Sequence, residues 1–365
     1  MLPLIAQPSL PVRAAAASGS GPAGGSGAAA DASSGASGPE SGIWRCVGRS
    51  GATKRHRRCT RRGRLSTIAT VVCASATVLA AAGCTRSEHT SGAPRGSCPV
   101  PPVPVVVSVE QWGDIVSSLA GDCADVTTIV RGSTGDPHEF EPTPSDIASF
   151  DGAELVVVNG LGYDTWASDA QRAASGSPSV IDAGKVAGRK LGDNPHIWYD
   201  PAVVHEVADS VTAALSERSP KAAGYFEARA SDWKQSMVPY DAAVEQLRTN
   251  AAGRTYAATE SVFDPMAAAI GLKDLTPAGY RKAAANESEP AAVDLAAFDS
   301  ALRNRSVDVL IVNTQTEGSV PEALRSVAGS AGVAVVDVTE AVPSGSTFVQ
   351  WQLDQLHSLS TALGL

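Results

Sequence analysis

The chain has 365 residues, with 29 Lys or Arg against 38 Asp or Glu and a formal net charge of −9. The charge is unevenly distributed: residues 1–83 hold ten basic and two acidic residues, so the remaining 19 basic and 36 acidic residues give a net charge of −17. An acidic domain of this kind disfavours nucleic acid as a partner and favours cations near its surface.

The first 83 residues are predicted to be a leader and not part of the fold. Residues 1–53 form a low-complexity extension rich in Ala, Gly and Ser, which we interpret as the product of a mis-assigned start. Residues 54–83 join a basic segment, an apolar segment and small residues, as is typical of a signal peptide. Two alternatives are a transmembrane anchor, since about 18 apolar residues can just span a bilayer, and a twin-arginine export signal at Arg61-Arg62.

The sequence around Cys84 predicts attachment to a membrane. Cys84 follows Ala81-Ala82-Gly83, which resembles the cleavage box of bacterial lipoproteins. This resemblance implies a lipid on Cys84 and makes residues 84–102 a polar tether. The mature protein is therefore expected outside the cytoplasm, anchored by the lipid to the outer face of the cell membrane.

Cys98 and Cys123 are the two cysteines that follow Cys84. In an exported protein, which matures in an oxidising environment, a disulfide between them is the natural pairing. It would close a loop of about 25 residues and stabilise the fold by roughly 3 kcal/mol. The alternative is a pair of thiolate metal ligands, although the spacing matches no common zinc pattern.

Residues 103–218 alternate between predicted strands and helices. Runs of β-branched residues predict strands at 103–108, 126–130, 155–159 and 180–182. Apolar residues at helical spacing predict helices at 109–120, 145–150, 166–174 and 201–217. Because the connections are short, this alternation predicts a mainly parallel sheet with helices on both faces.

A long helix is predicted to follow, beginning near residue 219 and reaching about residue 250, with a kink expected near Val238 because Pro239 lies inside it. Residues 251–365 then repeat the alternation. Strands are predicted at 254–259, 307–313 and 334–336, and helices at 262–270, 291–303, 321–332 and 348–363.

Two loops place a histidine directly after a proline, and each loop follows a predicted strand. They are Pro137-His138 and Pro195-His196. Proline fixes its own φ and restricts the preceding residue, so each imidazole is presented from a stiffened loop. A lone histidine is usually a surface or core residue, but the repeated context favours metal ligands, since neutral imidazole is the commonest protein metal ligand.

In these loops and in the segments around them, the chain resembles the metal-binding receptors of bacterial ABC importers for zinc and manganese, a group that includes manganese-binding lipoproteins. The resemblance covers residues 104–362 and rests on four segments: DPHEFEPT at 136–143, VVVNGLG at 156–162, NPHIWYDP at 194–201 and ESEP at 287–290. It implies an N-terminal lobe at 103–218, a linking helix at 219–250 and a C-terminal lobe at 251–365. It also implies a membrane permease as the partner of a monomeric receptor.

The resemblance further implies a metal site formed by two histidines of the first lobe and two carboxylates of the second: His138, His196, Glu260 and Asp337. Each of them lies at or after the end of a predicted strand, where parallel sheets gather their ligands. Two neutral imidazoles and two carboxylates would neutralise a divalent ion. The alternatives are that Glu260 only stabilises a helix N-terminus and that Asp337 is only a turn residue.

The donor set bears on which metal is carried. Carboxylates suit Mn²⁺ and can bind through both oxygens, which allows a coordination number above the four that zinc prefers. The Irving–Williams order nevertheless predicts tighter zinc binding at a simple nitrogen and oxygen site. We therefore predict a receptor that transports manganese and binds zinc tightly in vitro, with zinc transport as the alternative.

Two alternatives to metal transport are a metallohydrolase and a receptor for a larger metal chelate. A metallohydrolase would keep an open position for water on its metal, and the sequence contains no His-Glu-x-x-His motif. A receptor for a larger chelate, such as a siderophore, would need a roomy pocket lined by aromatic residues or arginine, and aromatic residues make up only 5% of this chain. We therefore expect a transport receptor and not an enzyme.

Overall fold

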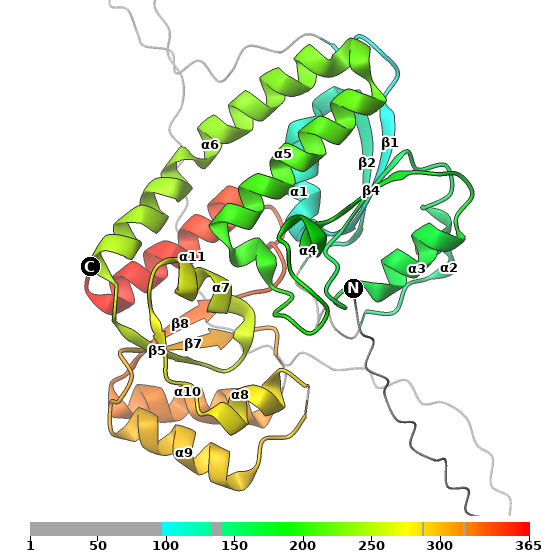
Figure 1. Ribbon diagram of the computed structural model, residues 1–365. Helices are drawn as coiled ribbons and strands as arrows, with labels where there is room; N and C mark the ends of the chain where they lie inside the picture. The colour runs from blue at the N-terminus through cyan, green and yellow to red at the C-terminus, as the bar shows by residue number, and fades with distance from the viewer. Residues whose placement is uncertain (1–96, 133–139, 287, 317) are drawn as a thin grey trace, which may run out of the picture. The chain divides into compact units, whose positions relative to one another are not determined.

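The computed structural model describes residues 97–132, 140–286, 288–316 and 318–365. The predicted leader at 1–83, Cys84 and His138 lie outside these described residues. Within them, the strands form two parallel sheets of four strands each, flanked by helices (Figure 1). This confirms the predicted α/β fold with two lobes. No helix of the described residues has the length and apolarity needed to cross a membrane.

The first sheet has the strand order β2-β1-β3-β4. Its strands are β1 (Val103–Val109), β2 (Ala124–Val130), β3 (Leu155–Val158) and β4 (Ser179–Asp182). The helices of this lobe are α1 (Glu110–Ala120), α2 (Pro144–Ala148), α3 (Thr165–Ala173), α4 (Ala183–Val186) and α5 (Pro201–Arg218). All four residues of β3 are buried, because helices cover both faces of a parallel sheet.

The lobes are linked by α6 (Ala223–Asn250), which follows the 3-10 helix η4 (Pro220–Ala222). The helix continues through Pro239, although proline removes one backbone donor. Its buried side chains on either side of that proline, Met237 and Tyr240, belong to the hydrophobic core. Helix α6 packs against α5 and against α11 (Phe348–Leu363), which lie along its length in Figure 1. Packing on both neighbours outweighs the lost hydrogen bond.

The second sheet has the strand order β6-β5-β7-β8. Its strands are β5 (Thr255–Ala258), β6 (Lys273–Asp274), β7 (Val309–Asn313) and β8 (Ala334–Val338). Its remaining helical segments are η5 (Ser261–Phe263), α7 (Asp264–Ala269), α8 (Ala278–Ala284), α9 (Ala292–Arg303) and α10 (Ser319–Ala331). The sequence did not predict β6, α4 or α8, because each is too short to show a periodic pattern.

The two lobes share one hydrophobic core. Its central side chain is Tyr199, whose ring centroid lies 5.5 Å from that of Phe263 and 5.6 Å from that of Trp351. The Tyr199 hydroxyl oxygen is 2.6 Å from the Thr339 carbonyl oxygen and 2.7 Å from Gln355 Oε1. An apolar interface with satisfied polar groups restrains relative motion of two lobes, so the strand ends of both sheets are positioned together.

Cys98 and Cys123 form a disulfide, and their Cα atoms are 5.0 Å apart. Replacing both with Ser is expected to lower the free energy of unfolding by about 3 kcal/mol, because the open chain gains loop entropy when it unfolds. Chemical denaturation of the two proteins measures the difference, and reduction of the unmodified protein should reproduce it. An unchanged midpoint, or two free thiols in non-reduced exported protein, would contradict this prediction.

Candidate metal centre

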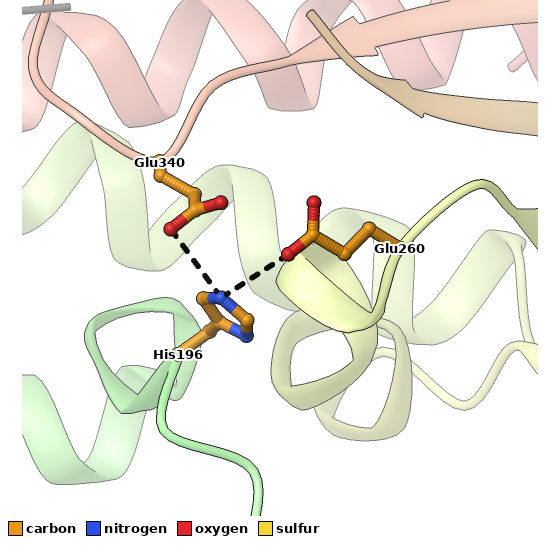
Figure 2. A group of neighbouring side chains, drawn as sticks. All are labelled: His196, Glu260 and Glu340. Atoms are coloured by element: carbon orange, nitrogen blue, oxygen red, sulfur yellow. Dashed lines mark ion pairs between the residues drawn. The ribbon is translucent and has the colours of Figure 1, made fainter. Parts of the chain in front are cut away.

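Three ligand-bearing side chains converge between the two lobes: His196, Glu260 and Glu340 (Figure 2). His196 Nε2 lies 3.5 Å from Glu340 Oε2 and 3.9 Å from Glu260 Oε1. One potential ligand atom from each residue lies within 4.8 Å of the other two. Ligands at about 2.0–2.2 Å from a tetrahedral ion are about 3.4 Å apart, so a single ion could bridge all three after small movements.

His196 is oriented by the loop that carries it. Its backbone N–H donates to Asn194 Oδ1 at 2.9 Å, so that oxygen acts as an acceptor. The same Oδ1 lies 2.8 Å from His196 Nδ1, which assigns the ring proton to Nδ1. The lone pair of Nε2 is then directed at the carboxylates, as a metal-ligating imidazole requires. Asn194 Nδ2 donates to the Ser261 carbonyl at 2.7 Å, so this loop is also fixed to the second lobe.

Glu260 lies two residues beyond the end of β5 and directly before η5. Its Oε2 accepts a hydrogen bond from Asn313 Nδ2 at 2.7 Å and another from the Thr316 hydroxyl. Asn313 is the last residue of β7, which pairs with β5. The carboxyl ends of two neighbouring parallel strands therefore supply the carboxylate and its donor, as expected for a ligand site of an open parallel sheet.

Glu340 lies two residues beyond β8, and its side chain is only 1% exposed. Its backbone N–H donates to Gln315 Oε1 at 2.7 Å, and its carbonyl accepts from Gln111 Nε2 at 2.7 Å. Its carboxylate accepts from Asn313 Nδ2 at Oε1, at 2.9 Å, and from the Tyr163 hydroxyl at Oε2, at 3.1 Å. Both lobes contribute donors, so the position of Glu340 depends on how the lobes are packed.

The charges of this cluster favour an added cation. Burial raises the pKa of Glu260, and the nearby Glu340 carboxylate raises it further. Burial by itself would lower the pKa of His196, but the hydrogen bond and charge of Glu340, together with the charge of Glu260, outweigh it and the pKa is raised. The metal-free cluster therefore retains protons beyond their usual pH range, and a divalent ion can replace them.

The raised pKa of His196 predicts a pH-dependent effect of metal on stability. The protonated imidazole and its carboxylates stabilise the metal-free protein below the ordinary value of 6.5, and this contribution is lost as the pH rises through the raised pKa. Metal requires the neutral imidazole, so the increase in Tm on adding Zn²⁺ should grow as the pH rises from below 6.5 through the raised pKa of His196. Thermal denaturation with and without metal measures it, and a constant increase across this range would contradict the assignment.

Of the four ligands expected from the sequence, His196 and Glu260 come together, His138 lies outside the described residues, and Asp337 is placed elsewhere. The Asp337 side chain is 55% exposed and pairs with Arg325 of α10. Strand β8 runs to Val338, two residues further than predicted, so Asp337 is inside the strand. Side chains alternate along a strand, and the neighbours Val336 and Val338 face the shared core while Asp337 faces away from it.

Glu340 takes the place that the sequence had given to Asp337. The sequence offers little reason to prefer one acid, because Asp337 and Glu340 both follow the strand predicted at 334–336 and are only three residues apart. A correct strand end at Val338 would have indicated Thr339 and Glu340 as the loop residues. No local sequence signal marked Asn313 and Tyr163, which donate to the carboxylates, or Gln111, which donates to the Glu340 carbonyl.

A cavity of about 720 Å³ opens beside this cluster. His196 and Glu260 lie in its wall, together with Tyr163 and Asp264. The wall also includes Arg281 of α8, which is paired with Asp274. Two of the three candidate ligands, His196 and Glu260, therefore line a cavity, whereas Glu340 is buried behind it.

Known proteins share both this sequence pattern and this fold. Residues 105–362 match the ZnuA family, described as zinc-uptake complex component A, periplasmic. The high-affinity zinc uptake system protein ZnuA of Bacillus subtilis is 23% identical over 245 residues, which cover 62% of this chain and 75% of that protein. The manganese-binding lipoprotein MntA of Halalkalibacterium halodurans is 32% identical over 167 residues, which cover 44% of this chain and 52% of that protein.

A solved structure of similar fold is that of the periplasmic zinc binding protein TroA from Treponema pallidum. It has a TM-score of 0.61 and 20% sequence identity, over 72% of this chain and 99% of that one. The family match extends through both lobes and includes His196, Glu260 and Glu340. This chain therefore belongs to the ZnuA family of periplasmic zinc-uptake components.

Proposed function

We propose that this protein is an extracytoplasmic receptor that captures a divalent transition metal, Mn²⁺ or Zn²⁺, and delivers it to the permease of an ABC importer. The observation that carries the proposal is the convergence of His196, Glu260 and Glu340 from two lobes. Membership of the ZnuA family supports it, as do the names of the two relatives, one a zinc uptake protein and the other a manganese-binding lipoprotein.

His138 is proposed as the fourth ligand. The segment that carries it follows Gly132, where an added Cβ would lie 3.7 Å from the Ser344 hydroxyl oxygen. Ser344 belongs to the same inter-element segment as Glu340, between β8 and α11. Gly132, the last described residue before His138, thus lies near the segment that contains Glu340, which supports a ligand set of two imidazoles and two carboxylates.

This ligand set suits capture of an ion better than catalysis. Two carboxylates and two neutral imidazoles carry a charge of −2, which a divalent ion neutralises. Four protein ligands complete the tetrahedral shell of a structural or transported zinc ion, whereas a catalytic zinc keeps three and leaves a position for water. The cavity of about 720 Å³ beside His196 offers the ion a route in and out.

Delivery to a permease requires the receptor to remain near the membrane. We propose that Cys84 carries a lipid and that residues 85–97 tether a monomeric receptor to the outer face of the cell membrane, because the disulfide at Cys98 fixes the following residues to the fold. The name of the lipoprotein relative from H. halodurans supports this arrangement. Mass spectrometry of native material tests it, and an unmodified Cys84 would contradict the anchor.

Metal analysis of the protein, purified without added metal, tests the central proposal. One equivalent of zinc or manganese per chain is expected, and both ions should bind in a competition titration at the same site. Binding of neither ion would overturn the proposal. Hydrolysis of esters or peptides that increases with metal content would favour the metallohydrolase instead.

A further inference from the structure

The side-chain amide of Asn313 lies between the two carboxylates of the metal centre. Its Nδ2 donates to Glu260 Oε2 at 2.7 Å and to Glu340 Oε1 at 2.9 Å. An amide nitrogen has two hydrogens, so these two bonds use both of them. Asn313 is only 2% exposed, and its bonds to these oxygens are therefore protected from competing water.

The direction of the Asn313 amide is fixed by its other contacts. Its Oδ1 accepts from the backbone N–H of Gln315 at 3.1 Å, which identifies the oxygen and hence the nitrogen. Its backbone N–H donates to the Thr259 hydroxyl at 3.2 Å, at the carboxyl end of β7. The amide is thus attached to the rigid sheet and cannot turn to release either carboxylate without losing hydrogen bonds.

The oxygens that Asn313 holds are not those that face the histidine. Glu260 directs Oε1 at His196 Nε2 while Oε2 is bound by the amide. Glu340 directs Oε2 at the same nitrogen while Oε1 is bound by the amide. Each carboxylate therefore presents one oxygen to the position between the three side chains. Asn313 binds the second oxygen of both carboxylates, and the Thr316 hydroxyl is a further donor to that of Glu260.

We propose that Asn313 is a specificity-determining positioning residue, which limits Glu260 and Glu340 to one metal-binding oxygen each and so favours zinc over manganese. The proposal rests on the receptor function proposed above. Zinc prefers four ligands in a tetrahedral arrangement, whereas Mn²⁺ prefers a larger, oxygen-rich shell. Two-oxygen ligation by the carboxylates would supply that larger shell. The hydrogen bonds from Asn313 oppose this mode, which the composition of the donor set had left open, because they compete with a metal for the second oxygens.

The variant Asn313→Leu tests the proposal, because leucine has a similar volume and no donor. Zinc and manganese affinities would each be measured by competition with a chelator. The zinc-to-manganese affinity ratio is expected to fall about 10-fold or more, the range seen when groups that orient metal ligands are removed. X-ray absorption of the zinc-loaded and manganese-loaded variant should also show a higher coordination number than in the unmodified protein.

Tyr163→Phe is the matched control. It removes the donor to Glu340 Oε2, the oxygen that faces His196. The hydrogen bonds from Asn313 to the other oxygen of each carboxylate remain. It should change both affinities together and preserve their ratio. Equal losses for both metals in Asn313→Leu would overturn the role of Asn313 while leaving the receptor function intact, whereas an unmodified protein that binds neither metal would refute the receptor function itself.

A measurement without any substitution covers the case in which Asn313→Leu does not fold. X-ray absorption of the unmodified protein loaded with zinc should show four light-atom ligands and no carboxylate bound through both oxygens. A carboxylate bound through both oxygens in that protein would overturn the proposal. The smaller variant Asn313→Ala provides a second measurement of the affinity ratio, with the same expected decrease.

Discussion

The variant Glu340→Gln is expected to bind zinc and manganese about 100-fold more weakly than the unmodified protein. Removal of groups that only orient a ligand already costs about 10- to 100-fold, and Glu340 is itself a proposed ligand. The substitution keeps the length of the side chain and removes one of the two negative charges facing His196. A loss of this size corresponds to about 2.7 kcal/mol of binding free energy, measurable by isothermal titration or chelator competition.

Asp337→Asn is the matched control for this prediction. It makes the same carboxylate-to-amide change three residues earlier in the chain, at a side chain that is exposed and paired with Arg325. Its metal affinity should equal that of the unmodified protein. If Asp337→Asn lost affinity and Glu340→Gln did not, the ligand assignment from the sequence would stand and the one proposed from the structure would be wrong.

The variant His196→Ala is the second substitution expected to remove most of the metal affinity, again by about 100-fold or more. The methyl group of alanine cannot replace the imidazole nitrogen that faces both carboxylates. In the metal-free variant, Glu260 and Glu340 also lose the cation that a protonated His196 supplies. The remaining pair of buried like charges should then take up a proton more readily.

His205→Ala provides the control for that substitution. His205 lies on α5, where its Nε2 is 2.9 Å from Asp241 Oδ1 of α6. It belongs neither to the cluster of His196, Glu260 and Glu340 nor to the wall of the cavity beside that cluster. It should bind metal normally. Because His196 is buried, the circular dichroism and Tm of both metal-free variants must be compared, and unchanged affinity in a folded His196→Ala protein would overturn the site.

The sequence by itself determined the architecture and indicated two of the proposed ligands, His196 and Glu260. Runs of β-branched residues alternating with helical periodicity indicate parallel α/β units, because burial on both faces leaves no alternation within a strand. The Pro195-His196 loop and the acid after strand β5 could also be recognised, because each follows a predicted strand and its position needs only the local order of strand and loop. Both features are set by residues close together in the chain, which is why the sequence could indicate His196 and Glu260 as candidates.

Only the tertiary structure distinguishes Glu340, which lies beside His196 and Glu260, from Asp337, which lies elsewhere. The choice depends on where β8 ends against β7, and pairing between strands fixes that end. It also decided which residues position Glu340. Asn313 and Glu340 are 27 residues apart and Gln111 and Glu340 are 229 apart, so no local pattern connects them. The bond from Asn313 to the carboxylate needs the pairing of β7 with β8, and the bond from Gln111 to the Glu340 carbonyl needs both lobes packed on one core. In each case packing brings distant polar groups into a buried site where each needs a partner.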